Sequence, residues 1–174
     1  MARIINGDRL LLFFRDYEKQ QTEDGAKLRF QTEHSVSKEK ESDSVWTKDG
    51  TQATIRDGEN TISISSLKYE EDGDILNVFD QLEELFDNNK LVEVWQVNLD
   101  SATADGTYTA NYYQGHFTSF EITAGDSAVE ASIEYAINGR GVKGTDKLSA
   151  EQLMAIEAEA YEYASIKALG TTEP

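Results

Sequence analysis

Residues 34–51 read HSVSKEKESDSVWTKDGT, a stretch rich in charged and hydroxyl side chains. Its charged positions alternate in sign early on: Lys38, Glu39, Lys40, Glu41 and Asp43. In a strand, successive side chains point to opposite faces, so the two lysines would lie on one face and the three acids on the other. Neither face is apolar from residue 37 to residue 44. This segment therefore has nothing to pack on the core of its own domain.

The composition is that of a single globular domain spanning residues 1–174. The chain is 39% hydrophobic and 28% charged, which is ordinary for such a domain. No apolar run approaches the roughly 18–20 residues of a membrane span. The opening residues, MARIINGDRLLLFF, predict a strand and not a signal peptide, so we expect synthesis in the cytoplasm. The chain has no cysteine, which excludes disulfide scaffolds and cysteine-based metal or nucleophile sites.

The charge is strongly acidic and unevenly distributed. The net charge is −17, with −2 in residues 1–60 and −15 in residues 61–174. Nucleic acid binding requires clustered lysine and arginine, because the phosphates dominate the affinity. The composition therefore argues against a protein that grips nucleic acid.

Alternation of apolar and polar side chains predicts a mainly β protein. Six segments show strand patterns: 9–15, 27–34, 61–68, 91–99, 107–123 and 128–137. In the last of these, apolar residues occupy every second position from Val129 to Ile137. In the segment 9–15, residues 10–14 form a continuous apolar run, as expected for a strand covered on both sides. Gly115 is expected to mark a bend or bulge in the long segment. Asp-Gly or Asn-Gly pairs at 24–25, 49–50, 57–58, 105–106 and 138–139 predict turns.

Two segments are predicted to be helical. Residues 73–87 place Ile75, Phe79, Leu82 and Phe86 on one face, which indicates an amphipathic helix. Residues 149–159 begin with Ser149 and Gln152 at the spacing of a capping box. Residues 161–167 return to alternation and suggest a terminal strand. The expected fold is an antiparallel β-sandwich or barrel with one flanking amphipathic helix.

Motifs for chemistry are weak. Residues 139–144 spell G-x-G-x-x-G after a strand, but a dinucleotide site needs those glycines to open a helix at once, so a glycine loop is the better interpretation. Residues 70–74 lack the spacing of a calcium loop. His34 and His116 lie in strand patterns without a catalytic motif to recruit them. We therefore expect neither enzymatic activity nor a cofactor or metal.

Five collinear segments of the chain form a recognisable series: FQTEHSVSKEKESDSVWTKDGT, ISISSLKYEEDGDILNVFDQL, LVEVWQVNLD, YYQGHFTSFEITA and IEYAINGRG. Through them, between about Ile5 and Gly141, the chain resembles the siphophage major tail proteins of the lactococcal-phage type. The resemblance implies the tail-tube fold that inner tubes of contractile tails and type VI secretion share. It also implies six subunits per ring, stacked rings in the virion tail, and passage of DNA through the tube. The implied partners are the chain itself, the tape measure protein, the distal tail protein and the tail terminator.

In such proteins a long hairpin or loop reaches beyond its own subunit, which would explain residues 36–52. The candidate contact residues are Lys38, Glu39, Lys40, Glu41, Asp43, Val45, Trp46, Lys48 and Asp49. Trp46 could anchor an interface or fold back onto its own sheet, and the whole stretch could instead be a solvated loop. An N-terminal arm at 1–8 and a C-terminal extension at 145–174 complete the expected organisation.

The acid excess also suits a conduit for DNA, because an anionic wall repels phosphate over about 8 Å at physiological salt. A different function remains open: an extracellular β-sandwich that binds sugar or peptide through its tyrosines. That alternative leaves the two-faced charged stretch unexplained.

Overall fold

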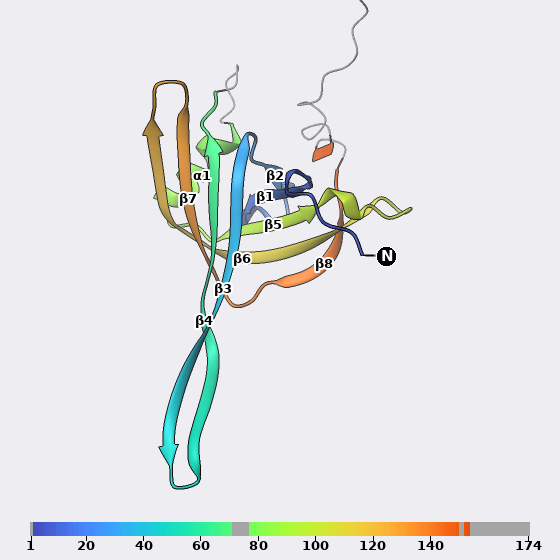
Figure 1. Ribbon diagram of the computed structural model, residues 1–174. Helices are drawn as coiled ribbons and strands as arrows, with labels where there is room; N and C mark the ends of the chain where they lie inside the picture. The colour runs from blue at the N-terminus through green and yellow to red at the C-terminus, as the bar shows by residue number, and fades with distance from the viewer. Residues whose placement is uncertain (1, 71–76, 150–151, 154–174) are drawn as a thin grey trace, which may run out of the picture.

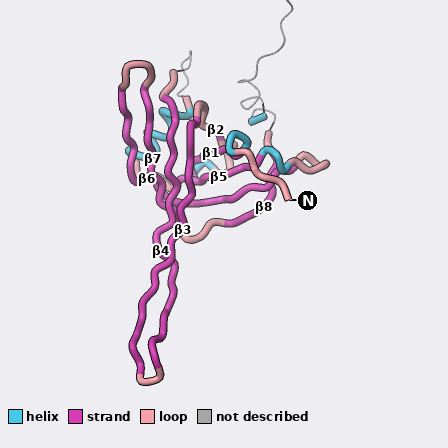
Figure 2. The backbone as a smooth tube through the Cα atoms, in the orientation of Figure 1, coloured by secondary structure: helices cyan, strands magenta, loops and turns pink. Residues whose placement is uncertain are grey.

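The computed structural model describes residues 2–70, 77–149 and 152–153, and the fold is built almost entirely from strands (Figures 1 and 2). The strands are β1 Leu10–Asp16, β2 Ala26–Lys27, β3 Gln31–Thr47, β4 Gly50–Leu67, β5 Val92–Asn98, β6 Thr107–Ala124, β7 Val129–Ile137 and β8 Val142–Lys147. The one α-helix among these residues is α1, Val78–Asp87, and three short 3-10 turns are η1 Gly7–Arg9, η2 Tyr17–Lys19 and η3 Leu99–Ser101.

All eight strands form one antiparallel sheet in the order β2-β1-β5-β6-β7-β4-β3, with β8 paired to β6. The long strand β6 belongs to two halves of this sheet. Its residues 109–115 pair with β5 and residues 107–112 with β8, whereas residues 115–124 pair with β7. In Figure 1, β5 and β8 run roughly horizontally, whereas β3, β4 and β7 run roughly vertically. The predicted antiparallel β fold is confirmed as one sheet folded over at β6.

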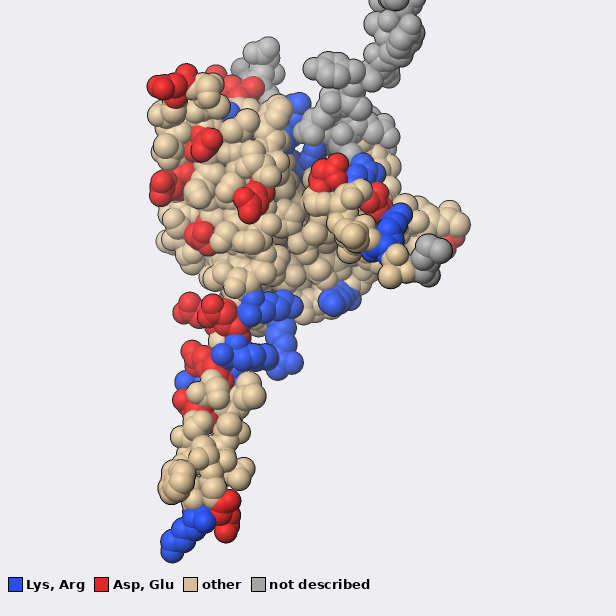
Figure 3. Space-filling model, in the orientation of Figure 1, with Lys and Arg blue, Asp and Glu red and all other residues tan. Residues whose placement is uncertain are grey.

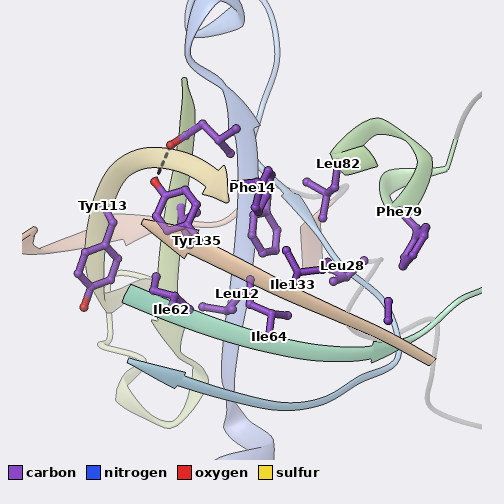
Figure 4. Packing of buried hydrophobic residues seen from close by; sticks show 14 of the residues in the cluster. Leu12, Phe14, Leu28, Ile62, Ile64, Phe79, Leu82, Tyr113, Ile133 and Tyr135 are labelled. Carbon is purple, nitrogen blue, oxygen red and sulfur yellow. Dashed lines mark hydrogen bonds between the residues drawn. The ribbon is translucent and has the colours of Figure 1, made fainter. Parts of the chain in front are cut away.

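The core lies between these halves (Figure 4). Its central members are buried residues of β1, β4, β5, β7 and α1: Leu12, Phe14, Ile62, Ile64, Phe79, Leu82, Val92, Val94, Ile133 and Tyr135. The Tyr135 hydroxyl donates to the carbonyl oxygen of Val92 at 2.7 Å, and its burial raises the pKa of that hydroxyl. Helix α1 closes one end of the core, with the Phe79 and Phe120 ring centroids 5.4 Å apart.

The apolar run in β1 is covered on both sides, as its pattern predicts. Leu12 and Phe14 face the main core, whereas Phe13 belongs to a second cluster on the opposite face with Val97 and Leu99. Alternation in β7 is also confirmed, because its odd positions from Ala131 to Ile137 are buried. Gly115 lies where β6 passes between Val92 and Ile137, and a Cβ there would meet the Ala136 carbonyl oxygen at 1.9 Å. Close backbone approach requires this glycine, at the position where β6 changes its partner from β5 to β7.

Some predicted boundaries differ from the observed ones. The expected strand 27–34 is broken, because β2 ends at Lys27 and β3 begins at Gln31, with Phe30 between them at a φ of 56°. Helix α1 is described from Val78, where Asn77 caps it by accepting a hydrogen bond from the Asp80 backbone N–H at 2.9 Å. Residues 71–76, which include the start of the predicted helix, lie outside the described part.

The chain after β7 departs further from prediction. Strand β8, residues 142–147, begins within the G-x-G-x-x-G sequence at 139–144, and every residue of the strand is exposed. An exposed strand has no apolar alternation, so its pattern gave no signal. Ser149 and Gln152 make the predicted capping box, with bonds from Ser149 N to Gln152 Oε1 and from Gln152 N to Ser149 Oγ. The rest of the expected helix 149–159, and the expected strand 161–167, lie outside the described residues.

Candidate assembly interface

The most prominent feature is a two-stranded arm, residues 39–59, that projects from the body (Figure 1). Strand β4 pairs with β7 from Asn60 to Leu67, and beyond that point β3 and β4 have no other strand partner among the described residues. At about 3.3 Å per residue, the nine residues from 39 to 47 extend roughly 30 Å. The tip is a two-residue turn at Lys48 and Asp49, closed by the Thr47–Gly50 pair with Gly50 at a φ of 114°.

The charges of the arm are largely neutralised by its own second strand (Figure 3). Arg56 Nε donates to Glu41 Oε2 at 2.7 Å, and Arg56 Nη2 lies 3.7 Å from Asp43 Oδ2. On the other face, Lys40 Nζ donates to Asp57 Oδ1. On β3, Lys40 and the two acids do lie on opposite faces, as predicted, but β4 adds Arg56 to the acidic face and Asp57 to the basic one. Neither face of the arm therefore carries charge of a single sign.

The other exposed feature of the arm is a neutral face. Strand register places three pairs side by side on it: Trp46–Thr51, Ser44–Ala53 and Ser42–Ile55. Trp46 is 83% exposed and Ile55 is 67% exposed, so Trp46 does not fold back onto its own sheet. Val45, 59% exposed, lies on the opposite face. A two-stranded ribbon is marginally stable alone, and a neutral face with an exposed tryptophan near its tip is a surface that a partner can cover.

The body carries a second distinctive surface on β3, β4, β7 and the second half of β6. Side chains that alternate with the buried ones point outward here, and register brings together Glu33, Ser35, Ser37, Thr61, Ser63, Ser65, Glu130, Ser132, Glu134, Ser119, Glu121 and Thr123. We call this the polar face. Among the described residues at these strand positions it has four glutamates and no lysine or arginine. Figure 3 shows acidic side chains over the part of the body formed by β6 and β7, and basic ones gathered at the root of the arm.

A buried carboxylate that the sequence patterns did not single out lies on β5. Glu93 is 1% exposed and accepts hydrogen bonds from Arg15 at 2.7 Å, from Gln20 and from the Tyr112 hydroxyl. Burial and the bond to Glu93 raise the pKa of Tyr112 to about 12, so this hydroxyl stays a donor. Both carboxylate oxygens have partners, and the network ties β1, β5 and β6 together. The Glu93 network therefore has a structural role.

Of the residues weighed as chemical motifs, 71–74 lie outside the described part of the chain. Among the described residues, no group of three or more His, Asp or Glu side chains is arranged to hold a metal ion. His34 accepts from the Gln96 side-chain amide at 2.9 Å, and burial lowers its pKa, so it is a neutral structural residue. His116 is exposed on β6. In the part of the chain that is described, no helix is long and apolar enough to cross a membrane.

Comparisons with known proteins agree with this geometry. Residues 4–143 match the phage tail tube protein family. A putative tail protein of Staphylococcus phage phiMR25 is 30% identical over 168 residues, covering 94% of this chain and 83% of that protein.

The fold is also that of solved tubes. The SPP1 tail tube has a TM-score of 0.71 at 14% identity, covering 98% of this chain and 95% of that one. The tail of an empty GTA particle, computed with C6 symmetry, has a TM-score of 0.59 at 14% identity, covering 82% and 99%. A sheath/tube terminator of an extracellular contractile injection system has a TM-score of 0.54 at 12% identity, covering 83% and 99%. The chain therefore belongs to the phage tail tube protein family and is a structural protein of a phage tail.

Proposed function

We propose that this chain is the repeating subunit of the tube, that its copies close into rings, and that stacked rings form the conduit for phage DNA. The observation that carries the proposal is the polar face together with the two free edges of the half-sheet beneath it. The arm then joins copies to one another. A sugar- or peptide-binding module is not favoured, since neither the arm nor the family membership fits it.

The half-sheet β3-β4-β7-β6 ends in an edge on each side. Strand β3 pairs only with β4, and β6 beyond Gly115 has no strand partner opposite β7 among the described residues. Exposed edges of this length invite pairing with another chain. Successive strands are antiparallel, so β3 and β6 run in opposite directions and a rotated copy would continue the same alternation. Closure of the ring would remove both edges.

Ring closure would also turn the polar face into a continuous wall. Six copies, the number suggested by the C6 symmetry of the GTA tail, would supply about 24 strands. Barrels of roughly 16–18 strands already enclose an aqueous channel. A wall of hydroxyls and glutamates offers DNA no cation to hold it. We therefore infer that Glu33, Glu121, Glu130 and Glu134 line the lumen, whereas the acids of α1 do not.

The arm is the proposed contact between copies. At roughly 30 Å it extends well past the body, and its neutral face needs a cover. Trp46 and Ile55 would bury most area there, with Lys48 and Asp49 at the tip contributing to the rim, whereas Val45 would meet a neighbour only on the opposite face of the arm. The other candidate residues lie nearer the root: Lys38, Glu39, Lys40, Glu41 and Asp43. Their charged groups would stabilise the arm itself as well as its contact with a neighbouring subunit.

We further infer that the chain has no enzymatic activity and needs no cofactor. By resemblance its other partners are the tape measure protein, the distal tail protein and the tail terminator, and assembly occurs in the host cytoplasm. The first test is negative-stain microscopy of concentrated purified protein with and without EDTA. We expect hollow tubes in both samples. A persistent monomer, or tubes that require a metal, would contradict the proposal.

The lumen assignment has its own test. A variant with Glu121→Lys, Glu130→Lys and Glu134→Lys should still form tubes, but those tubes should retain duplex DNA at about 150 mM salt, because clustered cations bind phosphate. The matched control places Glu84→Lys and Asp87→Lys on α1. Co-sedimentation with DNA measures retention, and equal retention by both variants would show that the polar face is not the lumen.

A further inference from the structure

The root of the arm is fastened to the turn between β7 and β8, residues 138–141. Asn60, only 7% exposed, accepts a hydrogen bond from the Glu39 backbone N–H at 3.1 Å. The same side chain donates to the Gly139 carbonyl oxygen at 2.7 Å. One buried amide therefore joins both strands of the arm to this turn at the point where the arm leaves the sheet.

Charged side chains make the same connection on the surface. Lys38 Nζ donates to the Arg140 carbonyl oxygen at 3.0 Å. Arg140 Nε donates to Asp57 Oδ2 at 2.8 Å, and Asp57 also accepts from Lys40. These hydrogen bonds, from Lys40 and then Arg140, lower the pKa of Asp57. Asp57 is thus ionised and shared between β3 and the turn.

The root is the place where the arm most needs such support. The pairing of β3 with β4 changes register between Lys38 and Lys40, because two residues of β4 oppose one residue of β3 there. A β-bulge bends a ribbon and increases its twist, and past Asn60 no third strand resists bending. Gly58 fits into this bulge, where a Cβ would meet the Glu39 carbonyl oxygen at 3.0 Å.

The turn itself is rigidly held by the body. Gly139 and Gly141 have φ values of 74° and 77°, which favour glycine. A Cβ on Gly141 would meet Tyr113 Cδ1 at 2.5 Å, and the Asn138 N–H donates to the Gln114 carbonyl oxygen at 2.7 Å. The first two glycines of the G-x-G-x-x-G sequence therefore shape a turn against β6.

We infer that the turn 138–141 and the side chains of Lys38, Asp57 and Asn60 form a bracket that sets the direction of the arm relative to the body. The bracket holds a bulged ribbon that would otherwise swing at its root. Its consequence for assembly rests on the proposed function, because an arm that swings must be ordered again each time it meets a neighbour.

Pulsed electron spin resonance on the monomer tests the bracket directly. The chain has no cysteine, so Lys48→Cys at the arm tip and Asp126→Cys in the β6–β7 turn give two unique label sites. We expect one narrow distance distribution in the parent. Arg140→Ala with Asp57→Asn should at least double its width, and Asn60→Ala should do the same. Glu18→Gln, which removes the Glu18–Lys90 ion pair on the body, is the matched control and should change nothing.

Two further measurements separate the bracket from folding and from the tube. The Arg140→Ala, Asp57→Asn variant alters only exposed side chains, so its melting temperature should match that of the control. Its tubes should form at least tenfold more slowly than those of the parent. An unchanged distance distribution in both bracket variants would overturn the inference. Because the distances are measured on the monomer, they do not depend on assembly, and a parent that forms no tubes would contradict only the proposed function.

Discussion

The body and the arm are parts of one continuous sheet, yet different interactions hold them. The body buries side chains such as Leu12, Ile133 and Tyr135 completely. Between residues 39 and 59 no side chain is buried, and the arm relies on backbone pairing and exposed ion pairs. Exposed pairs contribute roughly 0–1 kcal/mol each. The same two strands, β3 and β4, therefore contribute one stretch to the core and another that is outside it, and we propose that the outer stretch serves assembly.

The largest expected effect lies in the body. Gly115→Ala places a methyl group against the Ala136 carbonyl oxygen, where no side-chain movement can relieve the contact. We expect a loss of roughly 3 kcal/mol, at the upper end of overpacking costs, and a melting temperature lower by about 6–12 °C. Gly144→Ala is the control, because its Cβ would meet nothing within 4 Å. Thermal unfolding followed by circular dichroism measures both, and equal melting temperatures would contradict the close approach.

The next largest effect is expected in the arm, where substitutions should change assembly strongly and the melting temperature little. Trp46→Ala with Ile55→Ala removes the two large apolar groups of the neutral face, which touch no core. We expect the melting temperature of the monomer to change by less than about 2 °C. Assembly should weaken strongly, since truncating a central interface tryptophan typically costs about 2 kcal/mol or more per contact.

Light scattering against protein concentration would measure that weakening as a rise in the critical concentration for tubes. Val45→Ala, on the opposite face of the arm, is the control and should raise it less. If the control variant had the larger effect, the contact face would be assigned to the wrong side of the ribbon.

The smallest expected effect is a pH dependence of the folding stability of the body. His34 is neutral and accepts from Gln96, and its pKa is lowered by burial. The unfolded chain therefore binds a proton more readily than the folded one as pH falls below the ordinary value of about 6.5. Stability should decrease from pH 7.5 toward pH 5.5. His34→Gln should flatten this part of the melting-temperature profile, and an identical slope in the variant would contradict the assignment.

Local patterns predicted the body well. Strands such as β7 and the inner half of β4 show strict alternation because one side faces the core, and that periodicity is visible in neighbouring residues. The absence of an apolar face in 37–44 likewise indicated a segment outside the core. Residues 53–59 were missed as part of the arm, because they too lack an apolar face and Asp57-Gly58 resembles a hairpin turn.

The unpredicted parts depend on contacts between distant segments. The pairing of Lys40 with Asp57, and of Asp57 with Arg140, follows from register and from the bulge, which no local pattern encodes. The same is true of the polar face, whose glutamates come from β3, β6 and β7. Strand β8 could not be recognised, because both of its faces are exposed.

Deleting the arm would show whether residues 39–59 serve assembly and not folding. Lys38 and Asn60 are directly paired, so an Asn-Gly turn can join them in place of the arm. We predict a folded monomer whose melting temperature lies within about 4 °C of the parent, equivalent to roughly 1 kcal/mol, and no tubes by negative-stain microscopy. An armless chain that unfolds, or that forms tubes as the parent does, would contradict this division between body and arm.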